Sequence, residues 1–353
     1  MSRLDQMLDF VIAQGASDLH LISGIRPRLR RHGLLEELPD EPIDREEANQ
    51  LLFSIMSRRV RNEFNAKDNA DFAYVRVDGA RFRVNVFRHL GGIGAVFRHI
   101  PPVDFTLESL GLPEVLETIC MQKRGLILVT GKTGSGKSTT LAAMVDSINR
   151  RVHGHVLTIE DPVEFVHQRK RCLISQREVG DHTPSFAAAL RSALREDPDV
   201  ILVGEMRDLE TTSLAVTAAE TGILVMGTLH TNGAAATVDR IINTFPVEKQ
   251  PHVRTMLSTS LKAVVSQQLV PKADGSGVVA AVELLVNTPA VANLIREGKL
   301  DQIESVMQSG AAAGMQSMDN ALQRLLDDGL ISAEAAYEAA QVKSRFQHLL
   351  ESA

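Results

Sequence analysis

Several residue types are scarce in this 353-residue chain, which has no tryptophan, two cysteines and 4% aromatic residues. Cys120 and Cys172 are too few for a disulfide framework and too far apart for a C-x-x-C zinc site. No stretch approaches the about 18 apolar residues of a membrane span, and the first residues lack the regions of a signal peptide. We therefore expect a cytoplasmic protein. A net charge of −6 argues against a dedicated nucleic-acid binder.

The apolar pattern changes near residue 114 and divides the chain. Residues 1–100 mix helical spacing with alternating strands, which predicts an α+β domain. Tandem prolines open a linker over 101–113, because proline continues neither a helix nor a strand ladder. Strands then alternate with helices over 114–288, as in a parallel sheet covered on both faces. Residues 289–353 are predicted to form helices only, so the chain as a whole is of the α/β class.

Individual elements follow from the same patterns. In the first region we expect helices over 4–12 and 45–56 and strands over 18–22, 72–77, 81–88 and 93–100. In the second region the expected strands are 125–130, 155–160, 200–204 and 223–228. The expected C-terminal helices are 290–296, 300–308, 317–326 and 333–341.

One motif is far more specific than the rest. Residues 131–138 match the eight-position pattern G-x-x-x-x-G-K-[ST] between an apolar strand and a helical segment, which predicts a P-loop. Such a loop wraps its N–H groups around the phosphates of ATP, while Lys137 reaches the β- and γ-phosphates and Ser138 ligates Mg²⁺. The expected nucleotide-binding residues are Gly131, Lys132, Thr133, Gly134, Ser135, Gly136, Lys137, Ser138 and Thr139.

Three carboxylates follow the expected strand 155–160, in the octapeptide Thr-Ile-Glu-Asp-Pro-Val-Glu-Phe. Clustered negative charge is costly unless a cation or a proton occupies it. Glu164 is predicted to orient or deprotonate the attacking water, with Glu160 and Asp161 binding metal or positioning Glu164. Taken alone, the octapeptide is equally compatible with an acidic surface turn.

Two further strands also end in polar residues. The apolar run 200–204 ends at Glu205, the layout of a Walker B element, so this carboxylate is predicted to hold Mg²⁺. His230 follows strand 223–228 and is a candidate sensor of the γ-phosphate. The alternatives are a solvent-facing carboxylate and a structural histidine.

Arginines are candidates for the positive charge that stabilises the transferred phosphate. Arg83 and Arg98 lie in neighbouring expected strands, while Arg195 and Arg207 flank the strand before Glu205. Guanidinium groups fit phosphate oxygens bidentately, including across a subunit boundary. Ordinary ion pairs with the many carboxylates are the alternative for each of them.

Four motifs in this order resemble the type II/type IV secretion ATPase superfamily, and within it the pilus-retraction members. They are the P-loop, the acidic box 160–165, the segment 194–208 and the His box 229–231. The resemblance implies a PAS-like N-terminal domain, a RecA-like ATPase domain and a homohexamer with ATP between subunits. By position, Arg83 and Arg98 match phosphate-contacting arginines, and Glu164, Glu205 and His230 match the catalytic, Walker B and His-box residues.

The resemblance also carries expectations about partners and place. It implies a motor at the cytoplasmic side of the inner membrane, which removes pilin subunits through a membrane-embedded platform protein at the pilus base and reaches the membrane only through partners. Pilus-assembly and type II secretion relatives usually add N-terminal domains and a four-cysteine zinc insertion, which this sequence lacks. Retraction members carry Ala-Ile-Arg-Asn-Leu-Ile-Arg-Glu, but residues 290–297 replace the first arginine by Ala292, which puts the role of that position in doubt.

Two other functions remain open from the residues alone. A RecA-like nucleic-acid motor shares the P-loop, the sheet and the ring, but needs a basic groove and aromatic stacking platforms. A non-hydrolysing accessory regulator of pilus dynamics would tolerate loss of Lys137, Glu164 or Glu205, and none of these is replaced.

Overall fold

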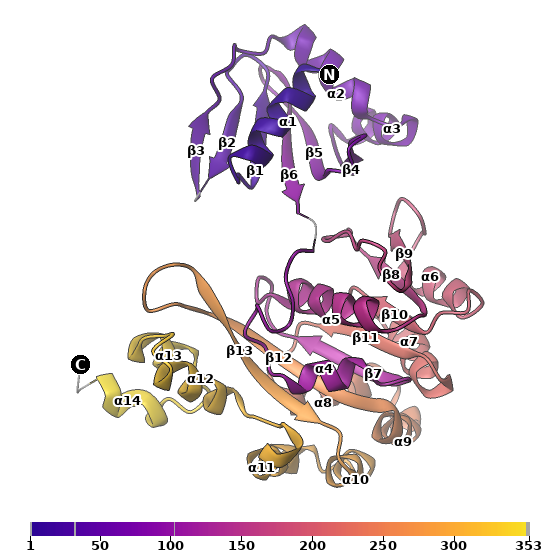
Figure 1. Cartoon of the computed structure of the whole chain (residues 1–353). Coiled ribbons are helices and arrows are strands. Elements are labelled where there is room, and N and C mark those ends of the chain that lie inside the picture. Colours follow the sequence, from indigo (N-terminus) through magenta and orange to yellow (C-terminus); the bar gives the residue numbers. More distant parts are fainter. Residues whose placement is uncertain (1, 32, 102, 351–353) are drawn as a thin grey trace. The chain divides into compact units, whose positions relative to one another are not determined.

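The computed structural model describes residues 2–31, 33–101 and 103–350 of the chain (Figure 1). The chain divides into two compact units, Met1–Pro102 and Val103–Ala353. The expected boundaries at 100, 113 and 288 are finer than this division and stay predictions. Pro102 of the expected linker and residues 1, 32 and 351–353 of the outer regions lie outside the described residues.

The first unit is a six-stranded antiparallel sheet with three helices. Its strand order is β3-β2-β1-β6-β5-β4. The strands are β1 (Asp18–Ile22), β2 (Arg28–Arg31), β3 (Leu34–Glu37), β4 (Asn69–Val75), β5 (Arg81–His89) and β6 (Gly92–Ile100). The helices are α1 (Arg3–Ala13), α2 (Arg45–Ile55) and α3 (Arg58–Lys67).

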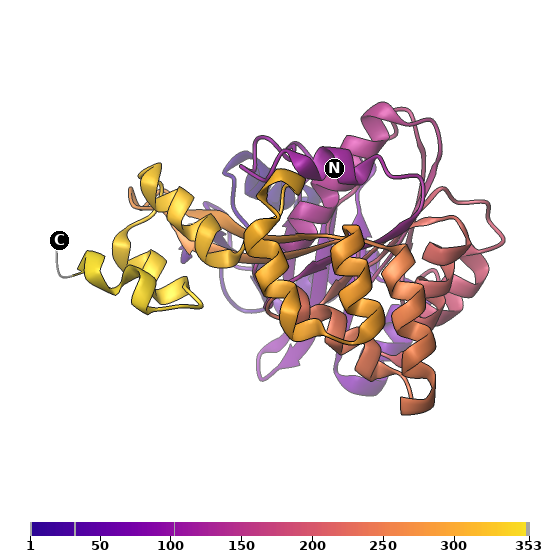
Figure 2. The same ribbon diagram turned by 90° about the horizontal axis from the view of Figure 1, so that it is seen from below.

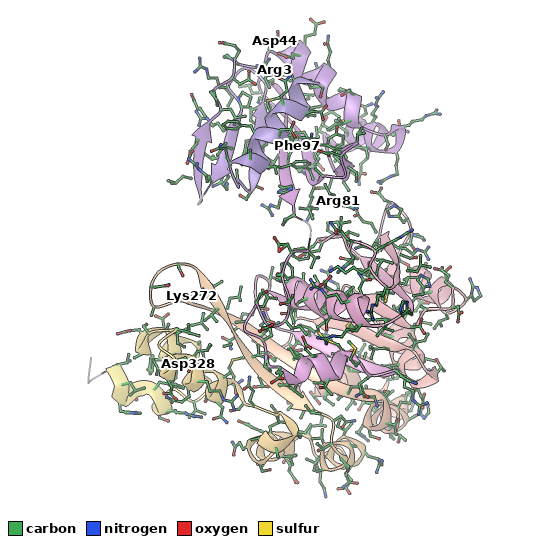
Figure 3. The ribbon with its side chains drawn as sticks, viewed as in Figure 1. Arg3, Asp44, Arg81, Phe97, Lys272 and Asp328 are labelled. Carbon is green, nitrogen blue, oxygen red and sulfur yellow. The ribbon has the colours of Figure 1, made fainter. Side chains whose placement is uncertain are left out.

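Helix caps and apolar stripes place these helices. Ser2 caps α1 by accepting the Asp5 N–H, and Asp44 caps α2 in the same way, since the first N–H groups of a helix lack partners within it. The buried stripe of α1 joins a core that includes fully buried Phe97 of β6. Figure 3 labels Asp44 and Phe97 together with Arg3, whose guanidinium pairs with Asp40 and Glu47.

The second unit is a seven-stranded sheet with helices on both faces. Its order is β13-β12-β7-β11-β10-β8-β9, and every neighbouring pair is parallel except β12–β13. The strands are β7 (Gly125–Thr130), β8 (His155–Glu160), β9 (Leu173–Glu178), β10 (Val200–Val203), β11 (Leu224–Leu229), β12 (Leu261–Pro271) and β13 (Val278–Val286).

Helices connect the strands of this unit and follow its last strand. They are α4 (Val115–Cys120), α5 (Lys137–Arg151), α6 (Phe186–Ala193), α7 (Leu209–Thr221), α8 (Ala234–Thr244), α9 (Gln250–Ser260), α10 (Pro289–Glu297), α11 (Ile303–Ser309), α12 (Met318–Asp327), α13 (Ala333–Ala339) and α14 (Ser344–Leu350). Short 3₁₀ turns are η1 (Val247–Lys249), η2 (Leu300–Gln302) and η3 (Ala311–Ala313). Among the described residues, none of the helices is long and apolar enough to cross a membrane.

Strand β7 shows how the sheet is covered. Leu126 and Leu128 pack in a core with helices α6 to α11, whereas Ile127 and Val129 pack in a second core with α4 and α5. Successive side chains of a strand point to opposite faces, so an all-apolar strand needs cover on both. Cys120 of α4 and Cys172 are buried free thiols, and burial raises the pKa of Cys120 to about 12.

The structure contains elements that the sequence patterns did not predict. Strands β2, β3, β9, β12 and β13 and helices α3 and α14 belong to this group. The expected helix 333–341 ends at Ala339, because Asp319 of α12 accepts the backbone N–H groups of Gln341 and Val342. The expected joint at 310–314 contains the turn η3.

The β12–β13 hairpin projects beyond the sheet and packs against the C-terminal helices (Figures 1 and 2). Figure 3 labels Lys272 in the hairpin and Asp328 beyond the end of α12. The Ala273 N–H donates to the Leu330 carbonyl at 2.9 Å, which joins the hairpin turn to the loop before α13. This hairpin therefore links the parallel sheet to helices α12 to α14.

Candidate active site

The P-loop joins β7 to α5 in the predicted context. Gly131, Gly134 and Gly136 have φ values of +138°, +80° and +86°, which side-chain-bearing residues rarely adopt. Gly136 is the N-cap of α5 and offers no side chain to the first N–H groups, so this helix end is available to an anion. The buried Lys137 ammonium donates to the carbonyls of Gly131 and Lys132 at 2.9 and 3.0 Å.

Gln267 of β12 packs against the P-loop and the first turn of α5. A Cβ on Gly131 would lie 2.4 Å from the Gln267 carbonyl oxygen, and one on Gly136 would lie 2.7 Å from Gln267 Nε2. The hydroxyl of Thr140 donates to Gln267 Oε1 at 2.7 Å, and both residues are buried. Gln267 could not be identified from the sequence, because nothing in an apolar strand marks one glutamine as a support for a distant loop.

The acidic box starts where β8 ends. Both oxygens of Glu160 accept hydrogen bonds, Oε1 from the Thr158 hydroxyl at 2.6 Å and the Gln176 amide at 3.3 Å, and Oε2 from the Glu164 N–H at 3.4 Å. Burial raises the pKa of Glu160. Glu160 therefore holds the backbone of Glu164, while the side chain of Glu164 is exposed and lines the pocket.

Glu205 lies between two positively charged or chargeable groups. One of its oxygens pairs with Arg207 and lies 3.1 Å from His230 Nε2. Burial opposes ionisation of Glu205, but Arg207 and His230 outweigh it and hold the pKa below its usual value. The Thr228 hydroxyl also donates to the Gly204 carbonyl, which ties the end of β11 to the end of β10. The acid and the histidine are thus fixed side by side.

These groups share one pocket because β7, β11, β10 and β8 are parallel neighbours and their carboxyl ends meet at one edge. The cavity has a volume of about 490 Å³, within the ordinary range for small-molecule sites. Of the predicted residues it is lined by Thr133, Gly134, Gly136, Lys137, Ser138, Thr139, Glu160, Asp161, Glu164, Glu205, Arg207 and His230. Burial lowers the pKa of Lys137, and the charges of Glu205 and Glu164 act against that shift.

Other predicted residues lie elsewhere. Gly131, Lys132 and Ser135 belong to the loop but do not line the cavity. Arg195 is exposed after α6, where its guanidinium donates to the Arg191 carbonyl at 3.1 Å, and it does not line the cavity.

Arg83 and Arg98 lie in the first unit, where the structure brings them together. They are directly opposite each other in the β5–β6 register, and both are exposed. Buried Asp18 accepts from Arg98 Nε at 2.9 Å. Two guanidinium groups on one exposed sheet face repel each other unless anions compensate them.

The cavity offers the kind of ligands that Mg²⁺ prefers. Ser138 and Glu205 both line the cavity and offer oxygen ligands, as P-loop sites do. Both oxygens of Glu160 are already engaged, which favours its positioning role over direct ligation. No cluster of three or more His, Cys, Asp or Glu side chains fit for a metal occurs among the described residues, so phosphate oxygens and water would complete such a site.

The sequence patterns also did not identify the apolar residues that line the cavity. Phe165, Phe186, Leu202 and Leu269 line it, and Phe165 packs edge-to-face against Phe105 with ring centroids 5.4 Å apart. Phe165 is the last residue of the acidic octapeptide. Its position next to the carboxylates in the sequence is the signal that could have identified it as a residue of the cavity. The others come from segments remote in sequence and carry no local signature.

Comparison with known proteins places this geometry in a family. Residues 1–343 match the family model described as type II/IV secretion system protein. The chain is 51% identical over 343 residues to the type IV pilus retraction ATPase PilT of Pseudomonas aeruginosa, covering 97% of this chain and 99% of that protein. It is 54% identical over 315 residues to a twitching motility protein of Neisseria gonorrhoeae, covering 89% and 84%.

A solved structure gives the same result for the fold. The crystal structure of the pilus retraction motor PilT with bound ADP superposes with a TM-score of 0.91 at 45% identity and covers 99% of this chain and 100% of that one. The predicted fold class, a RecA-like P-loop ATPase domain with a smaller N-terminal domain, is therefore confirmed. This chain belongs to the type II/IV secretion system protein family.

Proposed function

We propose that this protein hydrolyses ATP and uses the energy to retract type IV pili. The observation that carries this is the meeting of Lys137, Glu164, Glu205 and His230 in one cavity, in a chain that is 51% identical to PilT over almost its full length. The bound ADP in the related crystal structure supports a nucleotide as the ligand of that cavity.

The residues of the second unit have separable roles in this proposal. The N-terminus of α5 and the Lys137 ammonium bind the β- and γ-phosphates, and the Ser138 hydroxyl and Glu205 hold Mg²⁺, which supplies charge neutralisation on the phosphates. Glu164 accepts the proton of the attacking water, because its exposed carboxylate reaches into the cavity while Glu160 fixes its backbone. His230, aligned by Glu205, donates toward the terminal phosphate.

Arginines complete the charge balance. Arg207 lines the cavity next to Glu205, whereas Arg83 and Arg98 lie on an exposed face of the first unit. In the proposed homohexamer that face contributes to the nucleotide site of the ring, where two adjacent guanidiniums meet the phosphate charge they need. Arg195 stays a proposal, with its guanidinium bonded to the end of its own helix.

Mechanical output follows from closing and opening around the nucleotide. Binding closes an interface between neighbouring subunits of the proposed ring, and hydrolysis with product release reopens it, so that chemistry becomes domain rotation. We place the ring at the cytoplasmic face of the inner membrane at the pilus base, where it acts on the platform protein of the pilus machinery. It needs no nucleic acid and reaches the membrane through these partners.

Purified protein and cells test the proposal together. ATP turnover should be measured with and without DNA, next to Lys137→Ala. We expect turnover that DNA does not stimulate and that the variant loses. Cells without the protein should carry abundant pili and fail to twitch. Absence of turnover would favour the accessory regulator, stimulation by DNA would favour the nucleic-acid motor, and missing pili would favour an assembly ATPase.

A further inference from the structure

Helix α8 begins directly after the His box but lacks a cap of its own. Its N-cap is Gly233, with φ of +92°, and no side-chain cap from this position reaches the first turn. The first N–H groups of a helix need partners from outside the helix, and a negative charge there is favourable. The cap of α8 must therefore come from elsewhere in the fold.

Two facing residues of the β12–β13 hairpin supply it. Ser266 and Glu283 are direct cross-strand partners. The Gly233 N–H donates to Ser266 Oγ at 3.0 Å, and the Ala234 N–H donates to Glu283 Oε1 at 2.6 Å. Both side chains are buried, at 3% and 6% exposure. Burial raises the pKa of Glu283, and the hydrogen bond from Ala234 opposes that shift.

The second oxygen of Glu283 faces the C-terminal helices. Glu283 Oε2 accepts from Gln341 Nε2 at 3.2 Å, and Gln341 lies between α13 and α14. Buried Asp319 of α12 fixes this segment by accepting the N–H groups of Gln341 and Val342 at 2.8 and 3.0 Å. Gln341 is itself exposed. A single buried carboxylate thus connects α8 to a segment at the surface.

On the side of α8, this connection reaches the His-box loop, residues 229–231. The hydroxyls of Thr231 and Thr237 lie 2.7 Å apart, and Thr237 also donates to the Gly233 carbonyl at 2.7 Å. The Thr237 hydroxyl lies 3.4 Å from that of Thr130, the last residue before the P-loop. His230 immediately precedes Thr231 of this bonded turn, so the N-terminus of α8 is held next to the histidine that pairs with Glu205.

We propose that Glu283 is a positioning residue that couples the His-box loop to helices α12–α14 through Gln341. The inference rests on the proposed function for its catalytic consequence. A contact made by a partner on the C-terminal helices then changes the affinity for nucleotide, and nucleotide binding changes the affinity for that partner by the same coupling free energy. The contact also changes hydrolysis through the position of His230. Substitutions along such connections commonly change coupling by about twofold to thirtyfold.

The decisive variant is Gln341→Ala, which cuts the connection at an exposed residue and leaves the cap of α8 in place. Its matched control is Gln323→Ala, because that amide donates to Asp327 of its own helix. Hydrogen–deuterium exchange of the full chain should show that ADP changes exchange in residues 333–350 of the wild type and the control, but not of Gln341→Ala. We also expect kcat to fall about threefold to tenfold.

Variants at the carboxylate itself separate positioning from folding. Glu283→Gln keeps an acceptor for Ala234 and can pair with a reoriented Gln341 amide, so it should retain most of the activity. Glu283→Met removes the acceptor of the Ala234 and Gln341 bonds at similar volume and should lower kcat about tenfold or more, whereas exposed Glu248→Gln on η1 should not. The thermal unfolding midpoint shows which variants are folded.

The outcomes for the coupling and for the proposed function are distinguishable. If Gln341→Ala keeps the ADP-dependent exchange and the turnover of Gln323→Ala, the coupling is wrong while ATP hydrolysis stands. If the wild-type chain binds ADP without hydrolysing ATP, the motor function is wrong. The exchange comparison in that case still decides whether Glu283 and Gln341 link the two regions.

Discussion

The two units carry their charged residues in different ways. In the second unit the acids, the lysine and the histidine lie where parallel strands end, and contacts within that unit hold them around one cavity. In the first unit Arg83 and Arg98 lie within antiparallel strands on an exposed face, and Asp18 partners only one of them by a direct hydrogen bond. This difference indicates that the second unit can bind a ligand with its own residues alone. The first unit instead exposes the positive charge of two arginines to an anion that comes from outside the unit.

The largest expected effect concerns Lys137 of the second unit. Lys137→Ala removes the ammonium at the base of the P-loop and should lower ATP turnover about 1,000-fold, since the charge acts on phosphates in a confined site. ADP affinity should fall as well, which fluorescence titration measures. Lys123→Ala, at an exposed position just before β7, is the control. Equal turnover in both variants would contradict the assignment of the P-loop.

Glu164→Gln should come next in size. We expect turnover to fall about 100-fold or more while ATP binding persists, because the amide cannot accept the proton of water. Steady-state kinetics and equilibrium binding separate the two effects. Glu220→Gln, on the exposed side of α7, should behave like the wild type. Retained turnover in Glu164→Gln would leave the acidic box without its catalytic group.

The next prediction concerns the exposed arginines of the first unit. Arg83→Ala and Arg98→Ala should each lower kcat about tenfold to 100-fold, because each removes a guanidinium from the phosphate charge. Arg88→Ala is a control on the same strand, since Arg88 pairs with Asp68 and stacks on Phe64. If all three variants turned over ATP alike, the exposed arginines would have no part in hydrolysis.

The smallest effect concerns pH. The folded-state pKa of Glu205 is lowered, so the ionised form and its ion pairs persist above the unfolded pKa and are lost as pH falls through the folded one. Arg207→Ala removes one of the groups that lower it, so the acid limb of kcat should move to higher pH. A pH–rate profile measures this. If the acid limb of kcat stayed at the same pH, Arg207 would not determine the pKa of Glu205.

The sequence predicted the parts of the site that are local in the chain. Strand β7 and the P-loop have the expected bounds, because a buried parallel strand is wholly apolar and the motif is contiguous. Glu164, Glu205 and His230 could be placed at one sheet edge because each follows an apolar strand. Their roles in catalysis stay predictions.

The unpredicted parts depend on distant contacts. Strands β12 and β13 carry buried Ser266, Gln267 and Glu283, which interrupt the apolar runs that mark strands in a sequence. Strand β2 reads Arg-Leu-Arg-Arg and has only one buried residue, so its neighbours in the sheet decide its conformation rather than its own residues. Local patterns cannot reveal residues whose purpose is to support a loop 100 or more positions away.

The buried thiols of Cys120 and Cys172 have a practical consequence. The nucleophile in alkylation is the thiolate, and burial raises the pKa of both thiols, so neither native cysteine competes for a maleimide at neutral pH. Spin labels or fluorophores can therefore be attached at cysteines introduced on exposed positions without first removing the native ones. Distances between such labels would record how far each rigid body travels during a turnover.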